Sequence, residues 1–388
     1  MIQVIQIFGI LAALLASCCT SFTFAKINKQ MLAALQENAS AINADFRRNW
    51  QVHPALVNID SFTGTLYVVG DVHGDFEHLL ALLVHSGIVA VVSSDNGRSS
   101  WGSWDIKWMG GNAILVQSGD MINKGSESIK CLRFMAELEL KARAAGGKVL
   151  VLAGNHEVGF LAEPARKKYR NFVEEIDRLG LDIFNDVYSP NSWIGDWLRT
   201  RPLAAVINGV YMGHTGLINT SSLEELTSKY QQAVDSNNWG DQFLIGRTKK
   251  ENSILTSESW WKRNPPGAIF SSIPRIKGII FGHDPNAFGI RGRIVGFSLN
   301  NGLYSIIKVD VGVWDGESNG AIYRCSQWMP GGGCALHEVM YNLQSPGGQS
   351  RFEQMTLFPT TADGHLPIYD SGDESDNEEE KTKLHKGW

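Results

Sequence analysis

The sequence predicts an α/β fold in which neighbouring strands of a layered sheet end at one edge. Three apolar runs, at residues 66–69, 113–116 and 148–152, each stop at a polar turn that contains glycine. Runs of this length and composition are typical of buried strands. Helical spacing at 76–86 and 126–145 separates them, and alternation of strand and helix is typical of an α/β domain. We therefore expect the polar residues that follow these strands to lie together at one edge of the sheet.

The second half of the chain repeats this design with fewer helices. Further apolar runs lead into polar residues at 204–212, 278–281 and 306–309. Shorter helices are expected at 173–179 and 221–234. The pattern from 320 to 357 predicts hairpins and an edge layer.

Length and composition indicate a globular protein. The chain has 388 residues, of which 43% are apolar, enough for one large domain or two ordinary ones. The net charge of -5 argues against a general nucleic-acid binder, because surfaces that follow phosphates need an excess of Lys and Arg. We expect no nucleic-acid partner, and any binding of anions must be local.

The N-terminal segment predicts export. Residues 1–25 contain no Asp, Glu, Lys or Arg and end in a small-residue stretch, as in a secretory signal peptide. A lipoprotein leader that ends at Cys18 is a second interpretation, and an uncleaved anchor is a third, although the apolar run is shorter than the ~20 residues that a membrane span needs. The expected location is periplasmic, lipid-anchored or secreted, with membrane contact only through this N-terminal anchor.

The sequence divides the remaining chain into three parts. A helical pattern at 27–50 predicts an N-terminal helical extension over 26–62, followed by the main domain at 63–358. In 359–388 apolar residues become rare and acidic residues gather, so this part is predicted to be a disordered acidic tail that either solubilises the protein or docks a partner.

Three cysteines lie outside the leader. Cys131 falls in a helical pattern and is expected to be a small core residue. Cys325 and Cys334 flank a glycine-rich turn that could bring them together in an oxidising compartment. The sequence leaves open whether these two form a disulfide or stay free thiols.

The polar residues that follow the apolar runs form one candidate set of metal ligands. Its members are Asp71, His73, Asp120, Asn155, His214 and His283. Carboxylate and imidazole ligands suit manganese, iron or zinc better than calcium. Two divalent metal ions (Mn, Fe or Zn) divide the set naturally if Asp120 bridges them, since a carboxylate offers two oxygens. Two cations about 3.5 to 4 Å apart are suited to in-line phosphoester hydrolysis.

Five motifs resemble, in order, the signature blocks of the metallophosphoesterases (calcineurin-like phosphoesterases), and most closely the phosphoprotein phosphatase family. The family patterns GDxHG, GDxxDRG and GNHE are similar to GDVHGD, GDMINKG and GNHE here, and MGHTGL and FGHDPN resemble its later histidine blocks. The stretches WMGGNAILVQSGD and AGGKVLVLAGNHE are similar to the bacterial Shewanella-like branch. The resemblance covers about residues 63–316 and implies a four-layer α/β/β/α sandwich of two mixed sheets.

The resemblance also implies roles for individual residues. The six residues named above become metal ligands, with Asp71, His73 and Asp120 on one ion and Asp120, Asn155, His214 and His283 on the other. His156 becomes the acid that protonates the leaving oxygen. Lys124 stands where the family has its first phosphate-holding arginine, and Arg263 is expected to be the second, with Lys262 as a weaker candidate.

The second block departs from the family pattern at two positions. Asn123 stands where the family has the aspartate that pairs with the acid histidine, and it brings no charge to hold that histidine protonated. Lys124 holds phosphate as a point charge and lacks the bidentate fork of arginine. We expect a working but slower enzyme with a more acidic pH optimum.

The expected function is a metal-dependent phosphatase that acts on phosphoserine, phosphothreonine or phosphotyrosine in a protein or peptide. One alternative is hydrolysis of nucleotides or dinucleoside polyphosphates, on which related enzymes act. Another is a binding protein that keeps its metals but has low activity. Asp75 and Glu157 are expected to support the ligands, and Asp310 to tether a loop or contact substrate.

Overall fold

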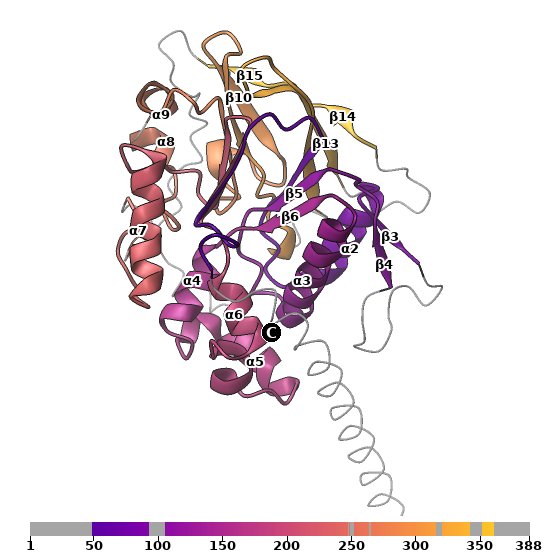
Figure 1. The fold of residues 1–388 in the computed structure, drawn as a ribbon, viewed down its shortest axis with the longest axis vertical. Helices are drawn as coiled ribbons and strands as arrows, with labels where there is room; N and C mark the ends of the chain where they lie inside the picture. Colours follow the sequence, from indigo (N-terminus) through magenta and orange to yellow (C-terminus); the bar gives the residue numbers. More distant parts are fainter. Residues whose placement is uncertain are drawn as a thin grey trace, which may run out of the picture.

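Two mixed β-sheets pack face to face in the computed structural model (Figure 1). The structure describes residues 49–92, 105–246, 248, 252–263, 265–315, 320–341 and 351–360. The predicted leader, the helix predicted at 27–50 except its last two residues, and the acidic tail beyond residue 360 lie outside the described residues.

The strands form two large sheets and one small ladder. The seven-stranded sheet has the order β1-β7-β8-β9-β11-β10-β15, and the six-stranded sheet has the order β14-β13-β12-β2-β5-β6. The first sheet consists of β1 (Leu56–Ile59), β7 (Ala204–Ile207), β8 (Val210–Gly213), β9 (Gly278–Phe281), β11 (Tyr304–Lys308), β10 (Val295–Leu299) and β15 (Phe358–Pro359). The second consists of β14 (Glu353–Gln354), β13 (Cys334–Tyr341), β12 (Ala321–Trp328), β2 (Leu66–Val69), β5 (Ile114–Gln117) and β6 (Lys148–Val151). The small ladder pairs β3 (Val89–Val91) with β4 (Ile106–Trp108).

The helices lie on the two outer faces and at one end of the sandwich. They are α2 (Phe76–His85), α3 (Ser128–Ala144), α4 (Asn155–Ala162), α5 (Arg170–Arg178), α6 (Trp193–Arg199), α7 (Leu223–Asp235), α8 (Trp260–Arg263) and α9 (Pro266–Ser272). Shorter helical turns are η1 (Lys167–Tyr169), η2 (Ile183–Tyr188), η3 (Ala287–Gly289) and η4 (Val313–Asp315). Figure 1 shows α7, α8 and α9 along one outer side and α2 and α3 along the other.

Alternation along the strands separates an apolar cluster between the sheets from one under the helices. On β2, Leu66 and Val68 join the cluster between the sheets, whereas Val69 joins the cluster under the helices. On β9, Ile280 points inward and Phe281 outward. Because successive residues of a strand face opposite sides, each sheet buries both faces. The predicted four-layer sandwich is confirmed.

The run predicted at 204–212 is two strands, not one. β7 and β8 pair antiparallel around Asn208 and Gly209, whose φ angles are 47° and 77°. Two consecutive residues at positive φ match the tight hairpin turn that Asn-Gly favours, and this sequence signal was missed. β1 lies within the predicted N-terminal extension yet pairs with β7, so the seven-stranded sheet begins before residue 63. The other domain limits stay predictions.

Cys325 and Cys334 form a disulfide across the β12–β13 hairpin, with Cα atoms 5.9 Å apart. The structure thus decides the alternative that the sequence left open. Cys131 is a buried free thiol on α3, as predicted. None of the helices within the described ranges is long and apolar enough to cross a membrane.

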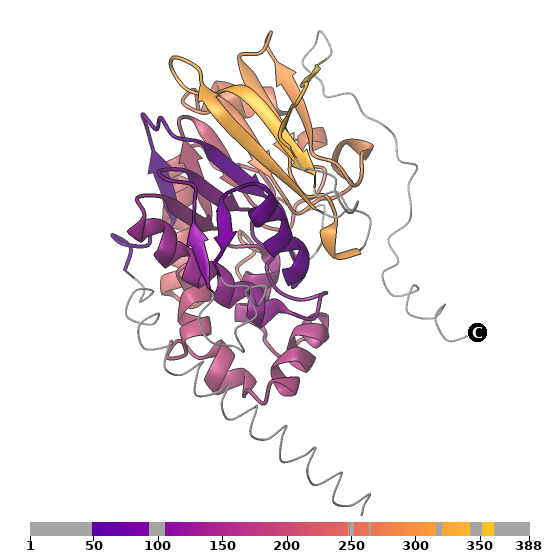
Figure 2. The ribbon, with the colours of Figure 1, turned by 90° about the vertical axis from the view of Figure 1, so that its right-hand side faces the viewer.

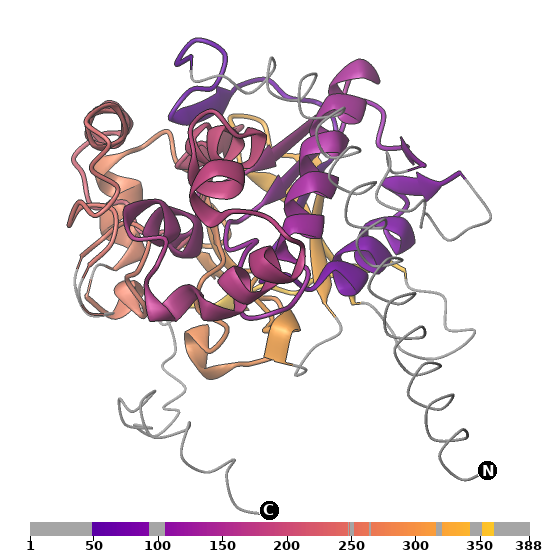
Figure 3. The same ribbon diagram turned by 90° about the horizontal axis from the view of Figure 1, so that it is seen from below.

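Helices α4, α5 and α6 cap one end of the sandwich (Figures 1 and 2). Seen from that end, they lie in front of the sheets (Figure 3). The loops that follow β2, β5 and β6 run toward this end, because these three strands are parallel neighbours. The predicted ligands of these loops therefore lie beneath α4 and the segment after it.

Candidate metal centre

The structure gathers the predicted ligands on loops at strand ends. Asp71 and His73 follow β2, Asp120 follows β5, and Asn155 opens α4 after β6. His214 follows β8 and His283 follows β9, so both sheets contribute. All six side chains are largely buried.

Left-handed backbone conformations concentrate in these loops. Positive φ angles occur at His73 (49°), Asp120 (56°), Asn123 (69°), Lys124 (67°) and His283 (64°). Side chains other than glycine seldom adopt this region, and such residues cluster at functional sites. The positive φ angles in these loops turn the side chains of the predicted site residues toward one another.

Asp120, Asn155, His214 and His283 form one tight group. The amide atom of Asn155 that faces the group lies 3.0 Å from Asp120 Oδ2, 3.0 Å from His214 Nε2 and 3.1 Å from His283 Nδ1. His214 Nε2 lies 3.2 Å from His283 Nδ1 and 3.4 Å from Asp120 Oδ1. Ligands about 2.1 Å from one ion are about 3.0 to 3.4 Å from each other, so these spacings fit a shared cation.

Hydrogen bonds set the histidine tautomers that a metal needs. His214 Nδ1 donates to the carbonyl of Ser118 at 2.9 Å, and His73 Nδ1 donates to the carbonyl of Ile122 at 3.1 Å. Each ring then presents an unprotonated Nε2 to the site. Such outer hydrogen bonds usually fix the orientation of a metal-binding imidazole.

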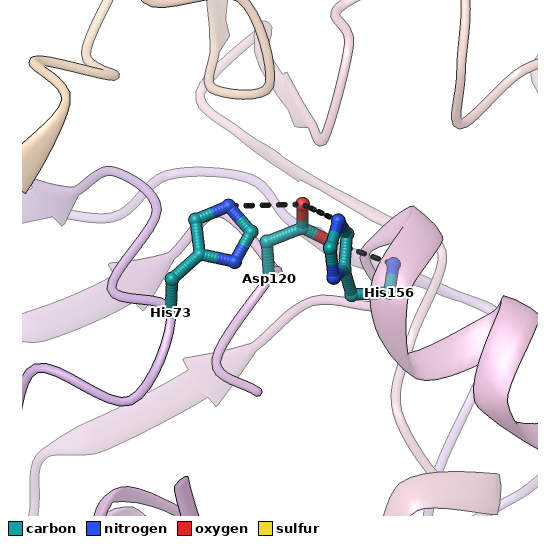
Figure 4. A group of neighbouring side chains, drawn as sticks. All are labelled: His73, Asp120 and His156. Carbon is teal, nitrogen blue, oxygen red and sulfur yellow. Dashed lines mark hydrogen bonds and ion pairs between the residues drawn. The ribbon is translucent and has the colours of Figure 1, made fainter. Parts of the chain in front are cut away.

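A second group contains His73, Asp120 and His156 (Figure 4). His73 Nε2 is 3.5 Å from Asp120 Oδ2, and His156 Nε2 is 3.9 Å from the same oxygen. Asp71 contacts the other group: both its carboxylate oxygens accept from the backbone N–H of His283, at 3.1 Å. Asp120 is thus common to both groups, as its predicted bridging role requires.

The contact of Asn123 decides where His156 carries its proton. Asn123 Nδ2 donates to the carbonyl of Lys168 at 2.9 Å, which fixes the amide orientation. The same Nδ2 lies 3.2 Å from His156 Nδ1, so that ring nitrogen must accept. The neutral ring then carries its proton on Nε2, and a protonated nitrogen can donate a proton but cannot bind a metal. This tautomer argues against a ligand role for His156. The predicted acid role requires a second proton, on Nδ1, which would face the Asn123 donor.

Burial dominates the electrostatics of the site. It raises the pKa of Asp71 well above its ordinary value, with help from Asp310 and Asp120, and raises the pKa of Asp120 to about 6. Burial also lowers the pKa of His73, and it lowers that of His214 to about 4. The site therefore combines carboxylates that are costly to bury as anions with neutral imidazoles. A divalent cation would offset the cost of burying the carboxylate anions, and the neutral imidazoles would serve as its ligands.

Two lysines bring positive charge to the site. The Nζ of Lys124 lies 3.8 Å from the ring centre of Trp314, and this ring packs edge-on against His73 with centroids 5.6 Å apart. The Nζ of Lys168 lies 3.1 Å from the outward-facing amide atom of Asn155. Both cations lower the pKa of His156, after burial and His73.

Arg263 makes different contacts. Its guanidinium donates to Ser257 Oγ at 2.9 Å and to the carbonyl of Glu258 at 3.2 Å. The carboxylate of Glu258 lies 4.0 Å from His283 Nε2. Arg263 is thus connected to the metal group through Glu258, and its predicted phosphate contact stays a prediction.

Glu157 holds two of the ligand loops in place. Its carboxylate accepts from the backbone N–H groups of Asp120 (2.9 Å), Met121 (2.7 Å), Ile122 (3.1 Å) and Gly154 (3.0 Å). A Cβ on Gly154 would lie 2.2 Å from the Asp120 nitrogen, so only glycine permits this approach. The structure therefore places Glu157 where the predicted supporting role requires it.

Two other acidic residues have separate tasks. Asp75 caps α2: its carboxylate accepts from the N–H of His78 at 3.2 Å and lies 2.7 Å from His78 Nδ1. Asp310 is buried beside the site and accepts from the N–H of Gly312 at 3.0 Å, which fixes the turn leading to Trp314.

Sequence reasoning missed Trp314 and Lys168. Trp314 lies four residues after Asp310, in a loop already recognised as following a strand, so a search along that loop could have found it. Lys168 lies in η1 among other basic residues, and nothing local distinguishes its side chain from that of Lys167. Only the packing of η1 onto the second motif reveals Lys168.

Residues 64–304, more than half of the chain, match the family described as calcineurin-like phosphoesterase. The chain belongs to this family. The metallophosphoesterase identity predicted from the motifs is thereby confirmed. The family binds divalent metals, and the grouping of acceptors around Asp120 fits such ions.

Individual relatives resemble parts of the chain. Shewanella-like protein phosphatase 2 of Arabidopsis thaliana is 37% identical over 93 residues, which are 24% of this chain and 20% of that protein. The symmetrical bis(5'-nucleosyl)-tetraphosphatase of Hamiltonella defensa is 29% identical over 154 residues, 39% of this chain and 44% of that protein. The matches thus span less than half of each relative's length.

A solved structure shares the fold over most of the chain. The cold-active protein tyrosine phosphatase of a psychrophilic Shewanella superposes with a TM-score of 0.57, covering 78% of this chain and 82% of that chain. The two sequences are 21% identical, so the likeness shows the fold alone.

Proposed function

We propose that the chain is a metal-dependent phosphomonoesterase whose substrates are phosphorylated proteins or peptides. The observation that carries this proposal is the group of Asp120, Asn155, His214 and His283, whose polar atoms converge at the spacing of ligands around one cation. The similarity to a protein named as a protein phosphatase supports the substrate class.

The proposed site would hold two divalent ions, manganese, iron or zinc, between the six ligands. When bound, such a pair polarises a phosphoryl group and lowers the pKa of a coordinated water. Asp120 belongs to both groups and would set the distance between the ions. Glu157 fixes that aspartate by holding the backbone of residues 120–122.

The remaining residues act on the substrate. Lys124, placed over Trp314 beside His73, is proposed to balance the charge of the phosphoryl oxygens. His156 Nε2 lies close to Asp120, and we propose that the ring, once doubly protonated, delivers its Nε2 proton to the leaving serine, threonine or tyrosine oxygen and becomes neutral. Because Asn123 brings no negative charge to this ring, we expect slow proton transfer at neutral pH.

Hydrolysis of dinucleoside polyphosphates is the second candidate, favoured by the similarity to a bis(5'-nucleosyl)-tetraphosphatase. One assay separates the two. The purified chain with added Mn²⁺ is given phosphoserine and phosphotyrosine peptides and diadenosine tetraphosphate, and phosphate release and nucleotide products are measured. Faster turnover of the peptides supports the proposal, and faster turnover of the nucleotide replaces it with the second candidate.

A third outcome of the same assay would overturn both. Protein that holds two metals per chain yet turns over none of these substrates from about pH 5 to 8 would be a metal-retaining binding protein. The matched control is Asp120→Asn, which removes the bridging charge and should abolish any activity that belongs to this site.

We also propose that the protein is exported. The disulfide between Cys325 and Cys334 supports this, because disulfides persist in oxidising compartments. A fusion of residues 1–25 to a reporter that is active only outside the cytoplasm tests the proposal. Activity of the reporter is expected, and its loss would contradict export by this segment.

A further inference from the structure

Lys168 lies in η1, the turn between α4 and α5, and this turn is fastened to the second motif. The carbonyl of Lys168 accepts from Asn123 Nδ2 at 2.9 Å, and Asn171 Nδ2 donates to the carbonyl of Lys124 at 2.8 Å. Further along, the carboxylate of Glu175 accepts from the backbone N–H of Ser128 at 2.7 Å. The position of η1 is therefore determined by the same loop that carries Lys124.

The ammonium group of Lys168 reaches the metal group from this turn. Its Nζ lies 3.1 Å from the outward-facing amide atom of Asn155, whose other amide atom lies among Asp120, His214 and His283. Burial raises the pKa of Asp120, and the N–H of His156, Lys124 and Lys168 lower it, in that order. Lys124 and Lys168 thus both stand near the bridging carboxylate.

The orientation of the Asn155 amide decides which of its atoms faces Lys168. As a metal ligand, Asn155 must present Oδ1 to Asp120, His214 and His283, because only the oxygen has a lone pair to offer. In the opposite amide orientation Oδ1 accepts from Lys168 Nζ at 3.1 Å. With Oδ1 turned to a metal, Nδ2 takes that place beside Nζ. Two hydrogen-bond donors side by side at the edge of a cation site match an anion oxygen that accepts from both.

We propose that Lys168 is a phosphate-binding residue. Its ammonium group and the Asn155 amide both donate to one oxygen of the substrate phosphoryl group. The proposal rests on the proposed function only in that this site binds phosphoryl groups. It assigns to η1 a cation that none of the recognised motifs contains. Lys167, the neighbouring residue of the same turn, is exposed like Lys168 and provides a matched control.

The test measures binding of inorganic phosphate to the full chain loaded with Mn²⁺, by calorimetry, with metal content determined on each sample. Lys168→Met is expected to weaken phosphate binding by about 10- to 100-fold, the usual loss for a charged hydrogen bond. Lys168→Arg should restore most of the affinity, because it keeps the charge. The phosphate affinity of the Lys167→Met variant should stay within about twofold of the wild type. This variant removes an equal charge at the neighbouring position, where solvent and salt screen it.

Four results would overturn the proposal. They are wild-type protein that binds no phosphate, K168M protein that binds as the wild type does, equal losses in K168M and K167M, and a loss in K168M that follows a loss of bound metal. The last would assign Lys168 to holding Asn155. Phosphate binding without hydrolysis of any substrate would agree with this inference and contradict the proposed function. The two failures are therefore distinguishable.

Discussion

Replacing Asn123 by aspartate should raise turnover on phosphoserine peptides about tenfold near pH 7 to 8. In the wild type, Asn123 Nδ2 is a donor 3.2 Å from His156 Nδ1, so a second proton on this ring would face a donor. A carboxylate at the same place would accept from Nδ1–H and attract the imidazolium. The variant should therefore hold His156 protonated at higher pH.

The magnitude follows from the geometry. An opposite charge within about 4 to 6 Å raises a histidine pKa by about 1 to 3 units. We take about one unit, the low end, because one carboxylate oxygen would also face the carbonyl of Lys168, which is 2.9 Å from the atom it replaces. Above the pKa of the acid, each unit gives about ten times more of the protonated form, or about 1.4 kcal/mol.

The assay is a kcat-pH profile for wild type and N123D with two substrates. A phosphoserine peptide has a leaving alkoxide that needs a proton, whereas p-nitrophenyl phosphate has a leaving group that departs without one. The gain should occur with the peptide and be nearly absent with the aryl ester. Asn171→Asp is the charge control, since it adds the same charge in the first turn of α5, where the side chain contacts the carbonyl of Lys124.

Two results would refute the reasoning: no gain with the peptide, or an equal gain with both substrates. The first would mean that Asn123 does not limit proton transfer through His156. The second would mean that the added charge acts on binding or metal affinity instead.

Three further predictions concern supporting residues. Glu157→Gln leaves one acceptor oxygen for four backbone N–H groups and should weaken Mn²⁺ binding about 10- to 100-fold, measured by calorimetry. Burial raises the pKa of Glu175 from 4.5 to about 7, so its stabilising effect is complete below pH 4.5 and is lost as pH rises to 7. Urea unfolding of the wild type should therefore show an extra loss of about 2 to 3 kcal/mol between these limits that Glu175→Gln lacks; parallel pH profiles would contradict this. Reduction of the Cys325–Cys334 disulfide should cost about 2 to 3 kcal/mol of unfolding free energy, and the C325S/C334S variant should not respond to reductant. Turnover should not change, because Cys325 pairs with Leu66 at the start of β2 and the ligands follow its end.

Local pattern was sufficient for most of the sandwich. The helices predicted at 76–86 and 126–145 occur at Phe76–His85 and Ser128–Ala144, because their apolar spacing and their flanking strands agree. The hairpin at Asn208 and Gly209 was signalled locally but overlooked. By contrast, β1 pairs with β7, a partner far away in the chain, and such pairing leaves little trace in a short segment.

The sequence by itself determined which residues could bind metal, because the ligands follow strands whose ends must meet at an edge of the sheets. The tertiary structure alone decided what those residues can do. The proton of His156 depends on Asn123, whose amide is oriented by the carbonyl of Lys168, 45 residues away. Likewise Lys168 differs from Lys167 only because η1 packs onto the second motif. Tautomers and charge placement depend on contacts between distant segments, and periodicity along the chain carries no information about them.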